Sequence, residues 1–140
     1  MEKYIEILEM LDSEKPKKIQ KRGIKLASKV EDLSCFIQPI YNNFGKGVWA
    51  NCARIFYYKS DYELQPYLKE LLEWTQDMNW PGAFIIFYRL KDMKPKLLVK
   101  KLEDAIDFAV KNDENQWLDY LGGFLYNKDL VLELSKKHLK

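Results

Sequence analysis

Residues 77–92 read "DMNWPGAFIIFYRLKD", and this stretch decides the fold. A loop made of Asp, Asn, Pro and Gly passes directly into an apolar run, which ends at a Lys-Asp pair. Within it, apolar residues recur at i, i+3, i+4 and i+7, the spacing of one face of an α-helix. These positions are Trp80, Ala83, Phe84 and Phe87. The pattern predicts a helix that ends near the Lys-Asp pair.

The start of this helix is predicted from the loop residues. Pro81 suits a first helical turn, where its missing N–H satisfies nothing and its φ is preset. Asp77 or Asn79 can accept a hydrogen bond from the free amides at that end. Trp80 can fold back over the preceding helix and pack between adjacent helices. The loop is therefore interpreted as a junction built from caps and core residues.

The same pattern occurs three times along the chain. Each copy begins with a Trp and has a Phe seven residues later: Trp49 and Phe56, Trp80 and Phe87, Trp117 and Phe124. Each then reaches a Lys and an Asp, which Ser60 separates in the first copy, and a Leu-rich stretch. We expect that stretch to be a second helix, capped by the Asp of the turn. In the second copy its apolar positions are Leu98, Leu102, Ala105, Ile106 and Ala109.

A weaker fourth copy lies upstream, in "KKIQKRGIKLASKVEDLSCFIQPI" at residues 17–40, and it lacks the Trp. The turn acids fall at Asp32, Asp61, Asp92 and Asp129, at spacings of 29, 31 and 37 residues. Such spacings are typical of helical hairpin repeats. The junction "NDENQW" at residues 112–117 repeats the capping chemistry, with Asp113 and Asn115 ahead of Trp117.

The array resembles the HEAT-like α-solenoids. The resemblance implies an all-α fold, a right-handed α-solenoid of about four irregular helix pairs that forms one domain over residues 1–140. More narrowly, "LLEWTQDMNWPGA" at residues 71–83 resembles a family of small bacterial helical domains with the motif L-L-x-W-x-x-D-x-N-W-P. Such domains are similar to the immunity proteins encoded beside toxins in polymorphic-toxin systems. Immunity is what the resemblance implies, and it supplies no catalytic residues.

Composition favours a soluble, cytoplasmic globular protein. The chain is 47% hydrophobic and 31% charged, and its longest apolar run is too short to span a bilayer. Aromatic residues make up 14% of it, more than a small core needs, so some should lie on a contact surface. Cys35 and Cys52 form no C-x-x-C pair and are expected to be reduced, buried thiols.

The sequence offers little catalytic chemistry. The only histidine, His138, lies two residues from the end, so a Ser or Cys nucleophile has no evident base. Glu103 and Asp107 share a helix face but have no partner pair on another helix. Neither a phosphate-binding glycine loop nor a zinc-binding set occurs in the sequence. We expect no enzyme activity, no metal and no cofactor.

Recognition of a partner is therefore the predicted role. The second helices should line an acidic groove, with candidate contacts at Glu70, Glu73, Glu103, Asp104 and Asp107. Asp77, Asn79 and Asp113 at the junctions are further candidates. An acidic groove favours a basic protein and repels nucleic acid, so the predicted partner is a cognate toxin, which is basic if it binds phosphates.

Two alternatives stay open. The first is a HEAT-like adaptor or scaffold without an inhibitory role. The second is a nucleic-acid-binding solenoid that uses residues 15–29, which contain seven Lys or Arg and no acid. This basic run is otherwise the solvated face of a helix. The two interpretations of the run differ in whether its lysines gather on one face.

Overall fold

The computed structural model describes residues 2–39 and 45–138, and within those ranges all regular structure is helical. The α-helices are α1 (Glu2–Met10), α2 (Lys17–Ala27), α3 (Trp49–Tyr57), α4 (Asp61–Leu64), α5 (Leu68–Glu73), α6 (Ala83–Lys91), α7 (Pro95–Lys111), α8 (Asn115–Leu121) and α9 (Lys128–His138). Short 3-10 helices are η1 (Ser34–Phe36), η2 (Gly45–Val48), η3 (Gln65–Tyr67), η4 (Trp74–Gln76) and η5 (Gly122–Tyr126). The predicted all-α class is confirmed.

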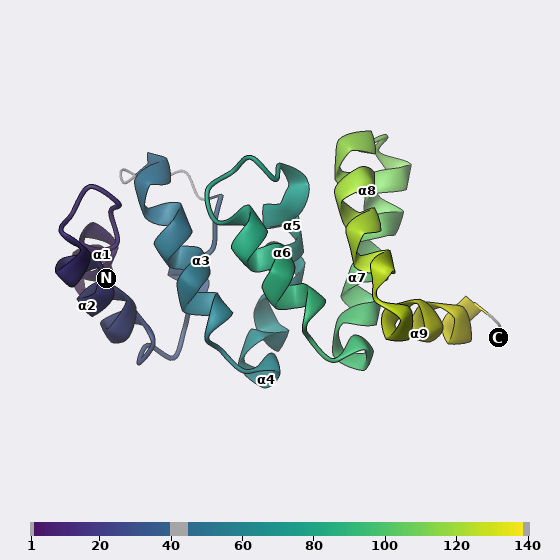
Figure 1. The fold of residues 1–140 in the computed structure, drawn as a ribbon, viewed down its shortest axis with the longest axis horizontal. Helices are drawn as coiled ribbons and strands as arrows, with labels where there is room; N and C mark the ends of the chain where they lie inside the picture. The colour runs from purple at the N-terminus through teal and green to yellow at the C-terminus, as the bar shows by residue number, and fades with distance from the viewer. Residues whose placement is uncertain (1, 40–44, 139–140) are drawn as a thin grey trace.

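The helices follow one another along the long axis of the molecule, so that the two ends of the chain lie at opposite ends (Figure 1). The first helices of two successive pairs, α3 and α6, pack side by side, and α2 packs against α3. Second helices do the same, since α5 packs against α7 and α7 against α9. Contacts therefore run mainly between neighbours in sequence, as a repeat array requires.

The second helix of the upstream copy was predicted wrongly. Its second apolar stretch, expected to be a helix, forms only the single 3-10 turn η1 and an extended segment, and Ile40 lies outside the described residues. Leu33 and Phe36 in this stretch are buried, so they contribute core without a helix. Pro39 lacks an N–H and disfavours helical backbone at the preceding residue, which leaves too few residues for a helix. The first pair is instead α1 with α2, which pack together.

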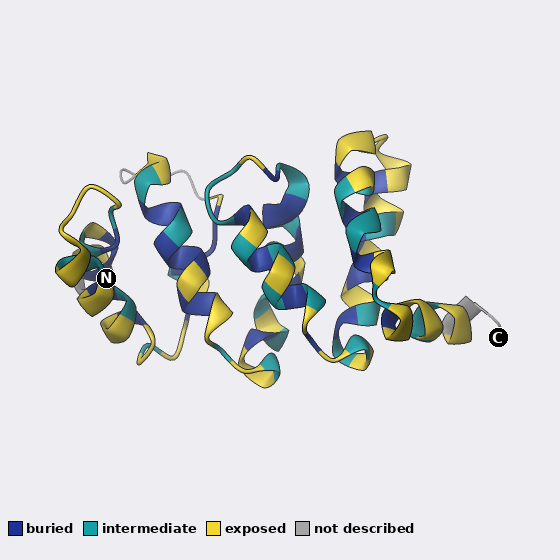
Figure 2. Ribbon diagram, in the orientation of Figure 1, coloured by how far each residue is buried: buried dark blue, intermediate teal, exposed yellow. Residues whose placement is uncertain are grey.

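The core is a continuous layer of buried side chains on the inner faces of the helices (Figure 2). In α7 the predicted stripe is correct: Leu98, Leu102, Ala105 and Ala109 are buried, and Ile106 packs beside them. In α6 the predicted stripe is correct in part: Ala83 is buried and Phe87 packs against the core, whereas Phe84 is 56% exposed. The core face of α6 is completed by Ile86 and Leu90, which are buried.

The predicted start of α6 was also wrong. Pro81 precedes the helix, and Gly82 is its N-cap, with a left-handed φ of 84°. A Cβ on Gly82 would lie 2.7 Å from the Cβ of Ala53 and 2.9 Å from the carbonyl oxygen of Trp49. The residue therefore has to be glycine for two reasons, backbone conformation and the close approach of α3.

The loop acids do not cap α6. Asp77 Oδ1 accepts a hydrogen bond from the Asn79 amide at 2.9 Å, which closes a turn inside the loop. The Trp80 ring packs edge-to-face on Trp49 of α3, with 5.9 Å between centroids. Trp80 therefore packs between adjacent helix pairs, as predicted.

The junction at residues 112–117 differs in the same way. Asp113 ends α7 instead of capping α8, and Asn115 is the first residue of α8. The Glu114 amide donates to the Ala109 carbonyl at 2.8 Å, and the Asp113 amide donates to the Val110 carbonyl at 3.3 Å. This is a Schellman motif, with Asp113 at the left-handed C′ position at φ 54°.

The Asp residues of the Lys-Asp turns do not cap the following helices. Ser60 caps α4 in a capping box with Glu63. No side chain caps α7, and Asn127 Oδ1 accepts from the amides of Asp129 and Leu130 at 3.0 and 3.3 Å. Asp61 is unavailable for capping because it pairs with Arg89 on the next first helix, at 2.7 Å.

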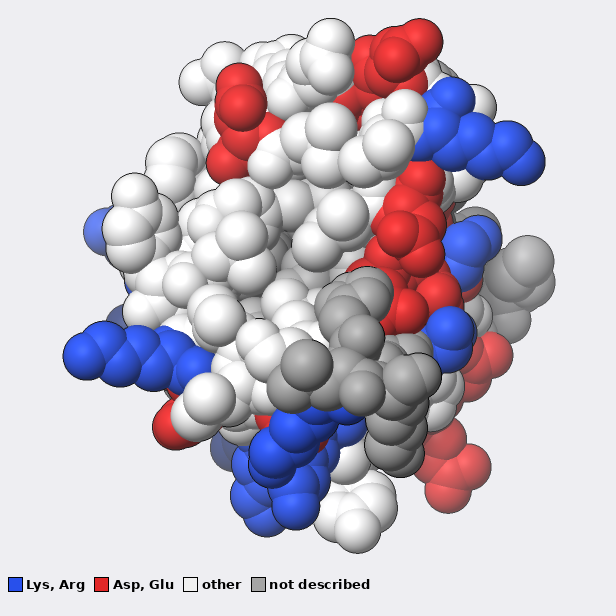
Figure 3. Space-filling view, turned by 90° about the vertical axis from the view of Figure 1, so that its right-hand side faces the viewer, with Lys and Arg blue, Asp and Glu red and all other residues white. Residues whose placement is uncertain are grey.

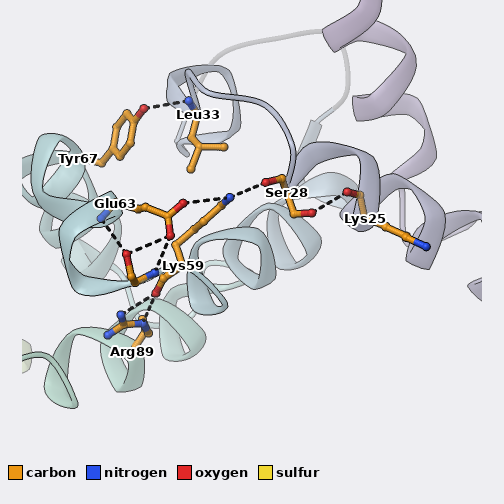
Figure 4. Close-up of polar contacts among 8 residues, drawn as sticks. Lys25, Ser28, Leu33, Lys59, Glu63, Tyr67 and Arg89 are labelled. Atoms are coloured by element: carbon orange, nitrogen blue, oxygen red, sulfur yellow. Dashed lines mark hydrogen bonds and ion pairs between the residues drawn. The ribbon is translucent and has the colours of Figure 1, made fainter.

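Instead, the turns are linked to one another by a ladder of hydrogen bonds. Lys59 Nζ donates to the Ser28 carbonyl at 2.6 Å, and Arg89 donates to the Lys59 carbonyl at 2.7 Å (Figure 4). The Asn127 amide group continues the ladder with a longer bond, 3.4 Å, to the Lys91 carbonyl. Each donor lies 30 to 36 residues beyond its acceptor, which matches the repeat length of the sequence. The ladder fixes each pair relative to the one before it.

Candidate protein-binding groove

The groove between α5 and α7 is built on a buried contact with α8. Trp117 of α8 donates from Nε1 to Thr75 Oγ1 at 3.1 Å, and Thr75 Oγ1 donates in turn to the Leu72 carbonyl at 2.6 Å. Thr75 is fully buried, so both of its bonds form away from water and are costly to break. This contact fixes the Trp117 ring at the base of the groove.

The groove has a volume of about 430 Å³ and draws its lining from three helices. Its walls and base are Lys69, Leu72 and Glu73 of α5, Lys101, Asp104, Ala105 and Phe108 of α7, and Trp117 of α8. Phe108 is 53% exposed and meets Trp117 edge-to-face at 6.2 Å between centroids. An exposed aromatic ring beside a recessed one is a feature of protein contact sites, since aromatic residues are enriched there.

The prediction that this groove is acidic was wrong. Two carboxylates, Glu73 and Asp104, face two lysines, Lys69 and Lys101, so the charges balance. The sequence argument counted the acids of α7 without the lysines that share its face. Asp104 also pairs with Lys100 at 2.9 Å, and both side chains are about half exposed or more. Such exposed pairs contribute little to stability.

Acidic side chains gather elsewhere. Figure 3 shows the end of the molecule that carries the last helices, where acidic side chains form a band beside uncharged surface and basic side chains lie below. The acid-rich segment, residues 103–119, belongs to α7, α8 and the turn between them. The basic run, residues 15–29, lies at the opposite end around α2. The net charge of +2 is therefore unevenly distributed, with the basic run and the acid-rich segment far apart in the molecule.

The structure brings only two of the predicted contact residues into the groove, Glu73 and Asp104. Glu70 on α5 and Glu103 on α7 are partly buried, and Asp107 is exposed on α7. Asp77, Asn79 and Asp113 lie in the two junctions, where they form turns or end a helix. The predicted repeat anchors all contribute to packing. Trp49, Phe56, Trp117 and Phe124 are buried, and Trp80, Pro81 and Phe87 are half-buried.

Sequence reasoning missed three residues that matter here. Phe108 lies off the apolar stripe of α7, and this displacement is itself a signal for an exposed contact. Thr75 has no such signal, because its partner Trp117 is 42 residues away. Trp74 was seen only as part of a motif, although it is fully buried and donates from Nε1 to the Pro81 carbonyl at 3.1 Å.

The groove lining contains no Ser, Cys or His. Burial raises the pKa of Cys52 to about 12, and burial with the Asp32 charge raises that of Cys35 to about 11, so both thiols are protonated near neutral pH. Both are free; Cys52 is buried as predicted, but Cys35 is only half-buried. The described part of the chain contains no group of three potential metal ligands, and no described helix is long and apolar enough to cross a membrane.

Comparison with known families matches residues 51–139 to the one described as "Domain of unknown function (DUF5071)". The chain belongs to this family. The match begins inside α3 and runs through α9, so it includes the groove and leaves out α1 and α2. No curated protein and no solved structure matches the chain. The family description gives neither a partner nor an activity, so the resemblance to immunity proteins stays a prediction.

Proposed function

We propose that this chain is a HEAT-like, right-handed α-solenoid that binds another protein in the α5–α7 groove and has no enzyme activity. The neighbour-to-neighbour packing of the helices and the ladder between their turns support the solenoid part. The inner wall of a solenoid, formed by its second helices, is its usual binding surface. The groove is lined mainly by α5 and α7, which are the second helices of their pairs, and this supports the proposal.

One observation carries the binding role, the Phe108–Trp117 pair at the groove. Phe108 exposes half of its surface beside a ring held by a buried hydrogen bond, so the apolar site is preformed. A preformed apolar pocket spares a partner the entropy of ordering it. The balanced charges on the rim can orient an apolar anchor through paired contacts without excluding either sign.

The biological role we propose is immunity, with a cognate toxin domain as the partner. Support comes from the "LLEWTQDMNWPGA" resemblance and from the acidic band at the end of the molecule that carries the last helices (Figure 3). Such a band speeds the approach of a basic protein, and nuclease toxins are basic because they bind phosphates. The adaptor alternative uses the same groove and differs only in what the bound protein does.

The test is co-purification with the product of the neighbouring gene, followed by a protection assay against that product. Phe108→Asp should weaken binding at least about tenfold, as expected for an aromatic anchor, and abolish protection. Val110→Asp is the matched control, since Val110 is 58% exposed on the same helix but outside the groove. If Val110→Asp lost binding and Phe108→Asp did not, the binding site would lie at the end of the molecule and not in the groove. Binding without protection would favour the adaptor.

Charge steering is tested separately. Replacing Asp104 and Asp107 with Lys should slow association and flatten its salt dependence, because charges farther apart than about 8 Å are screened at physiological salt. Dissociation and melting should change little, since surface substitutions shift stability by about 0.5 kcal/mol. Unchanged association at low salt would mean that the acids of α7 are merely solvated and that the partner is not basic.

A further inference from the structure

Four of the seven basic residues in the run gather along α2 and just beyond its C-terminal end. Lys21, Arg22, Lys25 and Lys29 line a shallow surface hollow together with Leu26. The opposite face of the helix is packed, since Gly23 and Ala27 are buried. None of the four cations makes an ion pair with any described residue. The face is therefore a set of uncompensated positive charges and not a salt-bridged helix surface.

Exposed aromatic rings lie on α3 and α6. Tyr57 and Tyr58 of α3, with Phe84 and Tyr88 of α6, line a second hollow whose other members are Arg54 and Ile85. Tyr58 is 75% exposed, and the other three rings are 42% to 56% exposed. Phe84 and Tyr88 are stacked at 6.3 Å between centroids. No acidic residue lines either hollow.

The helices that carry the two hollows are linked by hydrogen bonds. Asn51 of α3 donates to Gln20 of α2 at 2.8 Å and accepts from Arg54 at 2.8 Å, which places Arg54 beside α2. Near the other end of α3, Lys59 donates to the Ser28 carbonyl, and Ser28 bonds to the Lys25 carbonyl (Figure 4). Arg54, which lines the aromatic hollow, therefore lies close to the helix that carries the basic hollow.

We propose that this α2–α3–α6 face binds single-stranded nucleic acid. Lysines and arginines that track a phosphate backbone, next to exposed rings on which bases can stack, are the two elements of sequence-tolerant single-strand sites. Paired bases are stacked on each other and cannot use these rings, so duplexes should bind more weakly. The inference is independent of the α5–α7 groove, with which the face shares no residue.

Fluorescence anisotropy with labelled oligonucleotides of about 12 nucleotides tests the proposal. At about 50 mM salt, single-stranded DNA or RNA should bind at least about tenfold more tightly than the same sequence as a duplex. Comparing the DNA and RNA strands identifies which of the two is preferred. Binding to heparin and to both duplex and single strand alike would overturn the proposal in favour of a general polyanion surface, as would failure to bind any strand.

Two variants separate the contributions. Lys21→Glu with Lys25→Glu should reduce the slope of log affinity against log salt by about 1.4, at about 0.7 for each lost phosphate contact. Lys96→Glu with Lys111→Glu is the charge-matched control on α7 and should leave the slope unchanged. Equal losses in both double variants would mean that net charge alone drives binding, which contradicts the proposal.

Tyr58→Ala and Phe84→Ala test the stacking part. Each should weaken single-strand binding at least about fivefold while the salt slope stays the same, because stacking contributes no counterion release. Tyr126→Ala is the control, since that ring is 84% exposed at the other end of the molecule. All three residues are exposed, so the variants should fold. Unchanged affinity in both test variants would refute the aromatic half of the site and the proposal with it.

Discussion

The junction before α6 (residues 77–82) and the junction before α8 (residues 112–114) look alike in sequence and differ in structure. Both place Asp and Asn ahead of a Trp. In the first, Trp80 lies outside the helix and Gly82 brings the backbone against α3. In the second, a Schellman motif turns the chain at Asp113, and Trp117 lies inside α8. The repeat preserves residue types at these junctions while shifting their roles.

The shift has a structural cause. At the first junction the deeply buried indole is that of Trp74, which bonds to the Pro81 carbonyl and meets Phe56 edge-to-face at 6.4 Å. Trp80 is left as a half-buried cover over Trp49. At the second junction Trp117 is itself buried and bonds to Thr75. The first junction therefore depends on backbone contact, and the second on a side chain inserted from α8.

The largest expected effect follows from Trp74. Trp74→Ala should lower the free energy of unfolding by about 3 to 5 kcal/mol, since it empties the volume of a fully buried ring. Trp80→Ala should cost clearly less, about 1 to 2 kcal/mol, because its ring is only half-buried. Urea denaturation of both variants measures the difference. Equal losses would mean that the two indoles share the core role, and the comparison of the junctions would fail.

The next effect follows from Gly82. Gly82→Ala should cost about 3 kcal/mol, from the strain of a left-handed alanine and from the close approach of α3. Gly122→Ala is the matched control, because Gly122 has helical φ and open space around its missing Cβ. That variant should be neutral or stabilised by up to about 1 kcal/mol. If the two variants had similar thermal stability, the backbone of the first junction would be able to move away from α3 and make room for a Cβ.

Sequence patterns predicted the parts of this fold that depend on local periodicity. The buried stripe of α7 could be predicted from Leu98, Leu102 and Ala109, because the core-facing residues of a helix recur with the helical period. The start of α6 could not be predicted from periodicity. Gly82 is required there in part because Ala53, 29 positions earlier, leaves no room for a Cβ, and periodicity carries no information about such a distant contact. The same limit applies to the groove. Its charge depends on Lys69 and Lys101 reaching it from separate helices, and its base depends on the long-range Thr75–Trp117 bond.

The links between the turns allow a similar comparison, because the Asp61–Arg89 link is charged and the Asn127–Lys91 link is neutral. Burial raises the pKa of Asp61, but hydrogen bonds from Arg89 and the Lys94 amide lower it more, so the pKa lies below its usual 3.8. A lowered pKa in the folded state adds stability above the unfolded pKa, and this is lost as pH falls towards the folded value. Stability should therefore drop below about pH 4.

Asp61→Asn should remove about 1 to 2 kcal/mol at neutral pH and flatten this acid limb, since the hydrogen bonds to Arg89 lose their charge. The Asn127 link to Lys91 involves no ionisable side chain, so Asn127→Ala should lower stability without altering its pH dependence. Thermal melts between pH about 3 and 7 make the measurement. If Asp61→Asn lost stability just as steeply as pH fell, a different carboxylate would be responsible for the loss.

The smallest effect is expected at Asp113, and its sign is opposite to that at Gly82. Asp113 occupies the left-handed C′ position, where glycine carries no Cβ penalty, and its negative charge lies at the unfavourable C-terminal end of the α7 dipole. Asp113→Gly relieves both, partly offset by the greater entropy of glycine in the unfolded chain. A gain of about 0.5 kcal/mol is expected in urea denaturation. Asp107→Gly, in the interior of the same helix, should instead lose a few tenths. If Asp113→Gly were destabilising, the carboxylate would be holding the second junction through a contact of its own, and the junction would depend on side chains at both of its ends.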